Sequence, residues 1–153
     1  MNPETLFSRI TEIVATLGPR TEGLQRVAAA LRQSAGYRWV GLYDVDASRR
    51  EVRSLVWDGP AAPEYPTFPI TKGLTSSAIA EKRTVNAGDV AADPRYLTAL
   101  GSTRSEIIVP ILNDRGDVVG TIDVESERPN AFDRDTERLL ESCAALLRPL
   151  FAE

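Results

Sequence analysis

Apolar residues recur at intervals of three and four near both ends of the chain, which is the spacing of one face of an amphipathic helix. In the first stretch the repeat stops at Gly18 and Pro19, a pair that ends helices. The second stretch begins at Thr21, a residue type that caps helix N-termini, and stops at Gly36. The third begins at Asp133, which can also act as a cap. These helices are predicted over residues 4–17, 21–36 and 133–151.

Between these helices the pattern changes to runs of β-branched and aromatic residues, separated by polar or proline-containing stretches. The last two runs are joined by Asn113–Gly116, a hairpin signal in which Gly116 can supply a positive φ. Thr75 can cap a short helix that continues to about Lys82. Because the runs follow one another as hairpins, we expect an α+β fold with an antiparallel sheet of five to six strands and the terminal helices on one face. The predicted strands are residues 37–46, 51–57, 67–71, 84–86, 104–112 and 117–126.

The length of 153 residues fits one domain, predicted to span residues 1–153, with room for a substantial core. The net charge of −4, without a block of like charge, argues against a nucleic-acid partner. No apolar run approaches the ~18 residues of a membrane span, and the first residues lack the pattern of a signal peptide. We therefore expect a cytoplasmic protein with no membrane partner.

Two residue types limit the possible chemistry. The chain has no histidine, which excludes Ser-His-Asp triads, Cys-His dyads, imidazole zinc sites and histidine-ligated haem. It has one cysteine, Cys143, so an intramolecular disulfide and two-cysteine redox cycling within one chain are excluded. Cys143 lies on the apolar stripe of the last helix and is expected to be a buried core residue.

An aromatic pair on the first predicted strand is the first candidate for a ligand site. Trp39 and Tyr43 share one face of the strand with Gly41 between them, while Val40 and Leu42 point towards the helices. The glycine removes bulk between the two rings, which suits a slot for a ligand. The same pattern also suits apolar filler on a covered face, and the sequence leaves both interpretations open.

Three acids on the last two strands are the second candidate. Asp123 and Glu125 share one face, and Glu106 opens the partner strand of the same hairpin. This alternation also fits an ordinary sheet with its polar face in water. If the three carboxyls converge instead, their repulsion raises at least one pKa or requires a cation.

The start of the short helix is the third candidate. Thr75 and Ser76 follow Gly73, and backbone N–H groups at a helix N-terminus favour an anion. The alternative is a plain capping sequence. A nucleophilic role for Thr75 is not expected, because the chain has no histidine to activate it.

Three segments carry a resemblance to a known family: Trp39–Tyr43, Ser105–Pro110 and Gly120–Ser126. They resemble GAF domains, small α+β ligand-binding folds in which loops and a short helix cover a pocket on the open face of the sheet. Within this group the chain is most similar to free methionine-(R)-sulfoxide reductases, from about Tyr37 to Leu140. The resemblance implies that Trp39 and Tyr43 line the pocket, and that Glu106, Asp123 and Glu125 belong to it.

The same resemblance implies that the chemistry of the reductases is lost. Their cysteines would fall at Thr75, near Ala99 and near Tyr65, so no catalytic residue is predicted. We expect a stand-alone sensor or regulatory module that binds a small, amine-bearing or zwitterionic ligand without metal or cofactor. Bilin, haem and cyclic nucleotides are disfavoured. The alternatives are a divergent reductase that uses Cys143, and a scaffold without ligand that forms a homodimer through its terminal helices.

Overall fold

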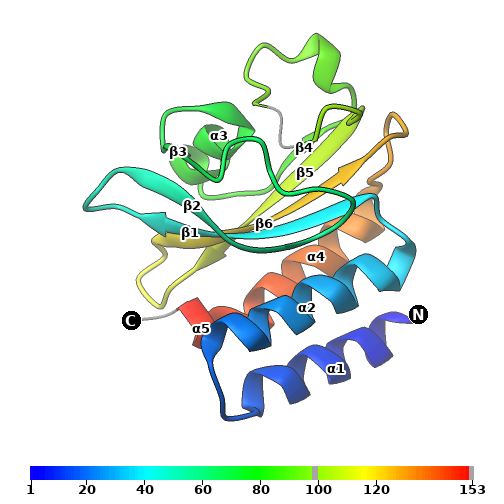
Figure 1. Cartoon of the computed structure of the whole chain (residues 1–153), viewed down its shortest axis with the longest axis vertical. Coiled ribbons are helices and arrows are strands. Elements are labelled where there is room, and N and C mark those ends of the chain that lie inside the picture. Colours follow the sequence, from blue (N-terminus) through cyan, green and yellow to red (C-terminus); the bar gives the residue numbers. More distant parts are fainter. Residues whose placement is uncertain (98–99, 152–153) are drawn as a thin grey trace.

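The core of the protein is one six-stranded antiparallel sheet with the strand order β3-β2-β1-β6-β5-β4 (Figure 1). The computed structural model describes residues 1–97 and 100–151. The strands are β1 (Trp39–Asp46), β2 (Glu51–Asp58), β3 (Thr67–Pro69), β4 (Val85–Ala87), β5 (Ser105–Leu112) and β6 (Val118–Ser126). The helices are α1 (Pro3–Ala15), α2 (Arg20–Ala35), α3 (Gly73–Glu81), the short 3₁₀ turn η1 (Val90–Ala92), α4 (Arg134–Leu146) and α5 (Arg148–Phe151).

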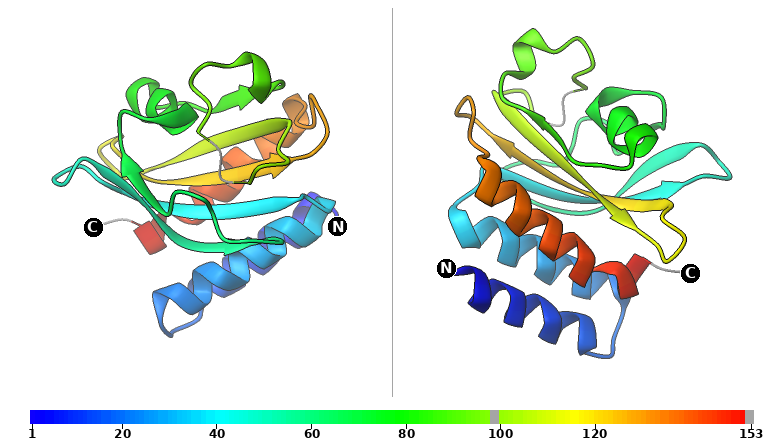
Figure 2. Two further views of the ribbon diagram at one scale, coloured as in Figure 1. Left: turned by 45° about the horizontal axis from the view of Figure 1, so that its top comes forward. Right: turned by 180° about the vertical axis from the view of Figure 1, so that it is seen from behind.

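The two faces of the sheet are covered differently (Figure 2). Helices α2 and α4 pack on one face, and α1 lies outside them as a further layer. Their apolar stripes meet the inward residues of β1, β5 and β6, among them Val40, Leu42, Ile122 and Val124, in the largest core. On the opposite face α3 packs over β4 and β5 around Leu74. The α+β class and the helix-covered face predicted from the sequence are confirmed.

Helix ends follow the chemistry of their flanking residues, with two corrections to the predicted caps. Asp133 accepts a hydrogen bond from the Thr136 N–H at 2.8 Å, as predicted, and Gly36 ends α2 with φ of 64°. Thr21 does not cap α2, because the helix already starts after Pro19, whose fixed φ suits a helix entrance. Thr75 does not cap α3 either; it lies within the first turn, and Lys72 is the cap position.

The hairpin between β5 and β6 forms as predicted. Gly116 has φ of 81°, and the Asn113 side chain accepts hydrogen bonds from the N–H groups of Arg115 and Asp117. This turn, together with a shift of the pairing between Ile111 and Leu112, sets the register that places Glu106 opposite Glu125. The position of the acids therefore depends on a turn at the far end of the same hairpin.

Two further predictions concern the helical layer. Cys143 is fully buried in α4, as predicted, and burial raises the pKa of its thiol to about 12. Within the described residues, no helix combines the length and the apolar character needed to cross a lipid bilayer. The homodimer through the terminal helices stays a prediction.

Candidate functional site

The three acids lie side by side on the face of the sheet that α3 covers. The register pairs Glu125 with both Glu106 on β5 and Trp39 on β1, and it pairs Asp123 with Gly41. Since directly opposed residues of an antiparallel pair have Cβ atoms about 5 Å apart, the three carboxyls form one cluster. The predicted convergence of Glu106, Asp123 and Glu125 is therefore present.

All three carboxyls are buried. The exposed fraction is 3% for Glu106, 5% for Asp123 and 0% for Glu125. The interpretation of this face as a polar surface in water is wrong, because α3 and the loops around it cover the sheet here. Within the described part of the chain, none of the salt bridges involves these acids. The cluster is thus an unneutralised group of buried acids, which is costly unless protons or a cation compensate it.

The carboxyl pKa values of Glu106 and Glu125 are both raised in the ligand-free protein. Burial, followed by repulsion from Glu125 and Asp123, raises the pKa of Glu106 well above its usual value. Burial also raises the pKa of Glu125 to about 7, although hydrogen bonds from Thr103, Glu106 and Tyr96 oppose the increase. The buried Oε2 of Glu125 has no hydrogen-bond partner among the described residues while Glu106 is ionised. A protonated Glu106 carboxyl supplies that donor.

The other carboxylate oxygen of Glu125 is held by two hydroxyl groups. Its Oε1 accepts a short hydrogen bond from Thr103 Oγ1 and a longer one, 3.3 Å, from the Tyr96 hydroxyl. Both donors come from the segment between η1 and β5. Their hydrogen bonds to Glu125 therefore hold this segment against the sheet. Neither residue was predicted from the sequence, because that segment has no strand or helix pattern that would fix where its side chains point.

Asp123 is the second acid whose protonation changes near neutral pH. Burial raises its pKa to about 8, with a smaller contribution from Glu125, while the Thr121 hydroxyl opposes the increase by donating a hydrogen bond to Oδ1 at 2.8 Å. At pH 7 the cluster is therefore mostly protonated when it is empty. A bound cation would favour the ionised form and release protons.

The aromatic pair of β1 is buried beside the acids. Trp39 and Tyr43 have ring centroids 6.4 Å apart, and Tyr43 contacts the ring of Phe68 edge-on at 6.0 Å. The indole of Trp39 lies across Gly41, because a Cβ built at Gly41 would come within 2.2 Å of Trp39 Cη2. The indole N–H also donates to the Ala61 carbonyl at 3.0 Å. Trp39 therefore fills the space above Gly41, and its hydrogen bond to Ala61 holds the loop after β2 in place.

A cavity of about 20 Å³ lies over the acids. Its lining residues are Tyr43, Tyr65, Phe68, Gly73, Leu74, Thr75, Leu97, Glu106 and Asp123. This volume holds about one water molecule. A larger ligand requires the covering side chains to move, and the exposed Tyr65 lies at this cover.

Of the seven predicted site residues, four line this cavity, two are buried beside the lining residues and one lines a different groove. Glu125 is buried next to Glu106, and Trp39 is packed behind Tyr43. Thr75 lines the cavity, whereas Ser76 faces a separate outer groove with Lys72 and Arg95. The four lining residues are Tyr43, Thr75, Glu106 and Asp123.

The positions that correspond to reductase cysteines by resemblance also fall here. Thr75 and Tyr65 both line the cavity. The third position, Ala99, lies outside the described residues. Tyr65, Phe68 and Leu97 were not predicted as lining residues, because they reach the acids from loops and from a strand at the sheet edge.

The donor set indicates what the site can hold. Carboxyl groups beside aromatic rings accept hydrogen bonds from an ammonium group, and a ring face attracts a cation. Among the described residues, no group of three or more His, Cys, Asp or Glu side chains is placed so that it could hold a metal ion. An organic cation or a zwitterion fits this arrangement better than an anion.

Comparison with known proteins places this site in context. The family model of the GAF domain matches residues 19–148. The chain is 28% identical over 144 residues to GAF domain-containing protein A of Dictyostelium discoideum, covering 94% of this chain and 89% of that protein. It is 32% identical over 110 residues to the free methionine-R-sulfoxide reductase of Saccharomyces cerevisiae, covering 71% of this chain and 60% of the reductase.

A solved structure gives the same result. The X-ray structure of free methionine-R-sulfoxide reductase from Neisseria meningitidis, in complex with its substrate, superimposes with a TM-score of 0.88. Sequence identity is 32%, with 97% of this chain and 87% of that chain covered. Close similarity to these reductases therefore extends from the sequence to the whole fold.

Proposed function

Because the chain belongs to the GAF domain family, we propose that it is a sensor or regulatory module that binds a small amine-bearing or zwitterionic molecule. The observation that carries the proposal is the buried cluster of Glu106, Asp123 and Glu125 without a basic partner in the described part of the chain. A buried acid cluster destabilises the empty protein, and such strain is common at binding sites. An ammonium group of a ligand would neutralise the cluster.

The surroundings support a zwitterion over a simple amine. Charge-assisted hydrogen bonds from an ammonium to the acids are short and strong, and the ring of Tyr43 adds a favourable surface for the cation. Gly73 and Thr75 bring the first turn of α3 to the same cavity. Its free N–H groups favour the carboxylate end of the ligand. A free amino acid or a derivative such as methionine sulfoxide combines both ends.

Ligand entry requires movement, because the closed cavity accommodates about one water molecule. Two sets of hydrogen bonds hold the segments over the cavity in place. The Trp39 indole N–H donates to the Ala61 carbonyl, and the hydroxyl groups of Tyr96 and Thr103 donate to Glu125. A ligand ammonium that binds Glu125 competes directly with the hydrogen bonds from Tyr96 and Thr103. Binding is thus expected to be slower than diffusion allows, since a conformational change accompanies it.

A divergent reductase is the second candidate, favoured by the similarity to free methionine-R-sulfoxide reductases. It requires a thiol at the sulfoxide. Cys143 belongs to α4 on the helix-covered face of the sheet, whereas the acids face α3. Burial also raises its pKa to about 12, so little reactive thiolate forms at neutral pH. These observations support a binding protein over an enzyme.

The binding proposal is tested by calorimetric titration with a panel of free amino acids, methionine sulfoxide and cyclic nucleotides. We expect saturable binding of at least one zwitterion and none of the cyclic nucleotides. Asp123→Asn should weaken that binding about tenfold or more, because a charge-assisted hydrogen bond contributes roughly 1.5–3 kcal/mol. The matched control is Asp135→Asn on the exposed surface of α4, where the carboxylate is 92% exposed. Equal loss in both variants, or no binding at all, would contradict the proposal.

The enzyme candidate is tested separately. We expect no reduction of free methionine-(R)-sulfoxide with dithiothreitol as the thiol donor. Turnover by the wild-type chain that disappears in Cys143→Ser would establish the divergent reductase instead. A protein that neither binds a ligand nor turns one over would leave the scaffold interpretation.

A further inference from the structure

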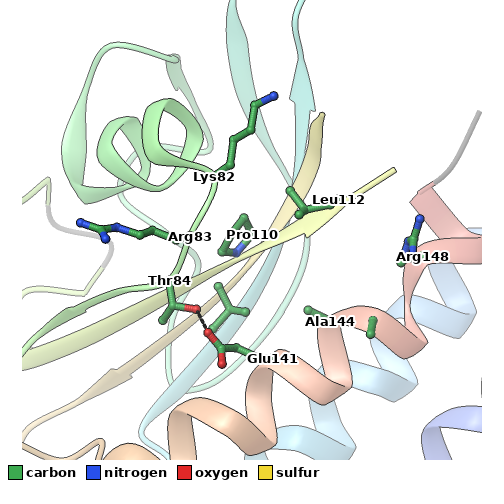
Figure 3. Close-up of a pocket in the computed structure, with 10 residues that line it drawn as sticks. Lys82, Arg83, Thr84, Pro110, Leu112, Glu141, Ala144 and Arg148 are labelled. Atoms are coloured by element: carbon green, nitrogen blue, oxygen red, sulfur yellow. Dashed lines mark hydrogen bonds between the residues drawn. The ribbon is translucent and has the colours of Figure 1, made fainter. Parts of the chain in front are cut away.

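A second cleft lies at the β5 edge of the sheet, between that strand and α4 (Figure 3). Its volume is about 320 Å³, within the range of small-molecule sites and far larger than the cavity over the acids. Its lining residues are Lys82, Arg83, Thr84, Val109, Pro110, Leu112, Glu141, Ala144, Ala145 and Arg148.

The cleft exists because β4 covers only part of the edge of β5. Strand β4 pairs with Glu106, Ile107 and Ile108; beyond them β5 is still paired with β6, but on its other side the described residues provide no strand partner. Pro110 stands at this uncovered edge and has no N–H to donate, which prevents another strand from adding there. On the facing helix, Ala144 and Ala145 are too small to fill the space. The two alanines thus leave this space open, and Pro110 makes it unsuited to binding a peptide strand.

Three basic residues and one acid line the cleft, and each basic side chain is paired with an acid outside the lining. Lys82 and Arg83 lie at one end and Arg148 at the other, and the acid is Glu141. The side chains of Lys82 and Arg83 point away from Pro110 and Ala144 (Figure 3). Glu141 is engaged by the Thr84 hydroxyl at 2.6 Å (Figure 3). The lining therefore combines an apolar floor with the cationic side chain of Arg148 at one end.

The three cations have acid partners that a ligand can replace. Arg148 contacts Asp114, whose side chain is 97% exposed, at 2.6 Å. Lys82 contacts Asp117 at 3.7 Å, and Arg83 contacts Glu81 at 3.4 Å, again with exposed acids. Exposed ion pairs contribute little, so exchanging one for the carboxylate of a ligand costs little.

We propose that this cleft binds a small organic anion with an apolar body, such as a medium-chain or aryl carboxylate. The apolar part packs on Pro110, Leu112 and the two alanines, and the carboxylate pairs with Arg148. The ligand class is opposite in charge to that proposed for the buried acids. The two sites are therefore expected to select different molecules.

Octanoate is a suitable probe, with its neutral analogue octanol as the comparison. In ¹H–¹⁵N correlation spectra of the full chain, octanoate should shift the amides of residues 82–84, 109–112 and 141–148, with Pro110 itself silent. Octanol should bind more weakly. Absence of saturable shifts, shifts centred on Glu106 and Asp123, or equal affinity for both probes would each overturn the proposal.

Two variant pairs sharpen the test. Ala145→Trp should fill the cleft and abolish the shifts, whereas Ser142→Trp, on the same helix but outside the lining, should preserve them. Arg148→Gln should weaken octanoate binding roughly threefold, the loss expected for an exposed ion pair, and leave octanol binding unchanged. Arg26→Gln on the exposed surface of α2 is the charge control. An effect of Arg26→Gln as large as that of Arg148→Gln would mean nonspecific attraction and refute the site.

Discussion

At the scale of single residues, Glu106 and Glu125 face each other across the β5–β6 hairpin with no cation beside them in the described part of the chain. Two ionised carboxylates at this separation repel strongly in a buried setting. The raised pKa of Glu106 and the pKa of about 8 for Asp123 favour protonated carboxyls at neutral pH, which reduces this cost. Protonation of the acids is therefore part of what holds the empty protein together.

Neutralising Asp123 should stabilise the ligand-free protein most at high pH. The pKa of Asp123 is raised on folding to about 8, so its contribution to stability is complete below its unfolded pKa of about 4 and is lost as pH rises towards 8. Asp123→Asn removes this loss. The stability difference between variant and wild type should grow by at least ~1 kcal/mol between pH 5 and pH 8.5, measured by urea denaturation.

The control is again Asp135→Asn, whose exposed side chain gives no reason for such a pH-dependent gain. A difference between Asp123→Asn and wild type that stays constant over this range would show that Asp123 is ionised at neutral pH. The buried acid cluster would then need another source of compensation.

A methyl group at Gly41 should disrupt the aromatic cluster. The added Cβ would come within 2.2 Å of Trp39 and 3.0 Å of Tyr43, so both rings must shift. We expect Gly41→Ala to cost about 1–3 kcal/mol of stability, as overpacking does, and to loosen the loop that Trp39 holds at Ala61. Thermal or chemical denaturation measures the cost.

Gly23→Ala is the matched comparison. Gly23 lies inside α2, and an added Cβ would have its nearest contact at 3.8 Å. This substitution should stabilise the protein by about 0.5–1 kcal/mol through the helix preference of alanine. If both glycine variants behave alike, close packing of Trp39 on Gly41 is not what selects glycine there.

The strand period correctly assigned the faces of these residues but could not reveal their burial. Alternation places Asp123 and Glu125 on the face opposite Ile122 and Val124, whether that face meets water or a covering layer. The deciding contacts come from α3 and from Thr103, which are distant in sequence. Only the family resemblance indicated from the sequence that this face is covered and not exposed to water.

At the scale of elements, α1 is a separate outer layer. It packs mainly on α2 and α4, through the buried side chains of Leu6, Ile10 and Ile13. The acids lie on the other side of the sheet. Changes in α1 should therefore affect stability without affecting the site.

Ile10→Ala tests this separation. Ile10 is fully buried, so its truncation should cost about 2–5 kcal/mol through lost burial and a residual cavity. Affinity for the ligand of the acid cluster should stay unchanged in calorimetric titration at a temperature where the variant is folded, because distant sites are usually additive. A marked loss of affinity would indicate coupling between the helical layer and the cavity.

Element boundaries were predictable where the local chemistry was strong. The β5–β6 hairpin and the Asp133 cap follow from turn and cap residues and match the prediction. The start of α3 does not, since Thr75 has the side chain of a cap but lies inside the helix. The chain turns into α3 at Gly73, whose φ of 75° makes the earlier start possible. At this helix start, the positive φ that Gly73 allows outweighs the preference of Thr75 for the cap position.

At the scale of the whole molecule, the site is assembled from four strands, one helix and the connections between them. The sequence predicts the sheet and the acids because these depend on local periodicity. It does not predict Tyr65, Leu97 or Tyr96, because their positions depend on how the covering segments fold back over the sheet. The closed cover and the protonated acids are properties of the assembled protein.

Affinity for an amine-bearing ligand should rise with pH between about 6 and 8. The empty acids hold protons in this range, since the pKa is about 7 for Glu125 and about 8 for Asp123, and a cation binds their ionised forms. The increase should reach up to about tenfold per pH unit for each proton released, as long as the ligand amine remains protonated. Titrations at pH 6, 7 and 8 measure it, and a flat profile would mean that binding does not ionise the acids.

The absence of histidine gives this proton exchange an unusually clear signal. In most proteins imidazoles take up and release protons over the same pH range and obscure a contribution from carboxyls. Here no imidazole does so, and the thiol of Cys143 titrates far higher. Binding heats measured in two buffers of different ionisation enthalpy would therefore count the protons expelled by the ligand. That count gives the charge state of the buried acids without a label or a mutation.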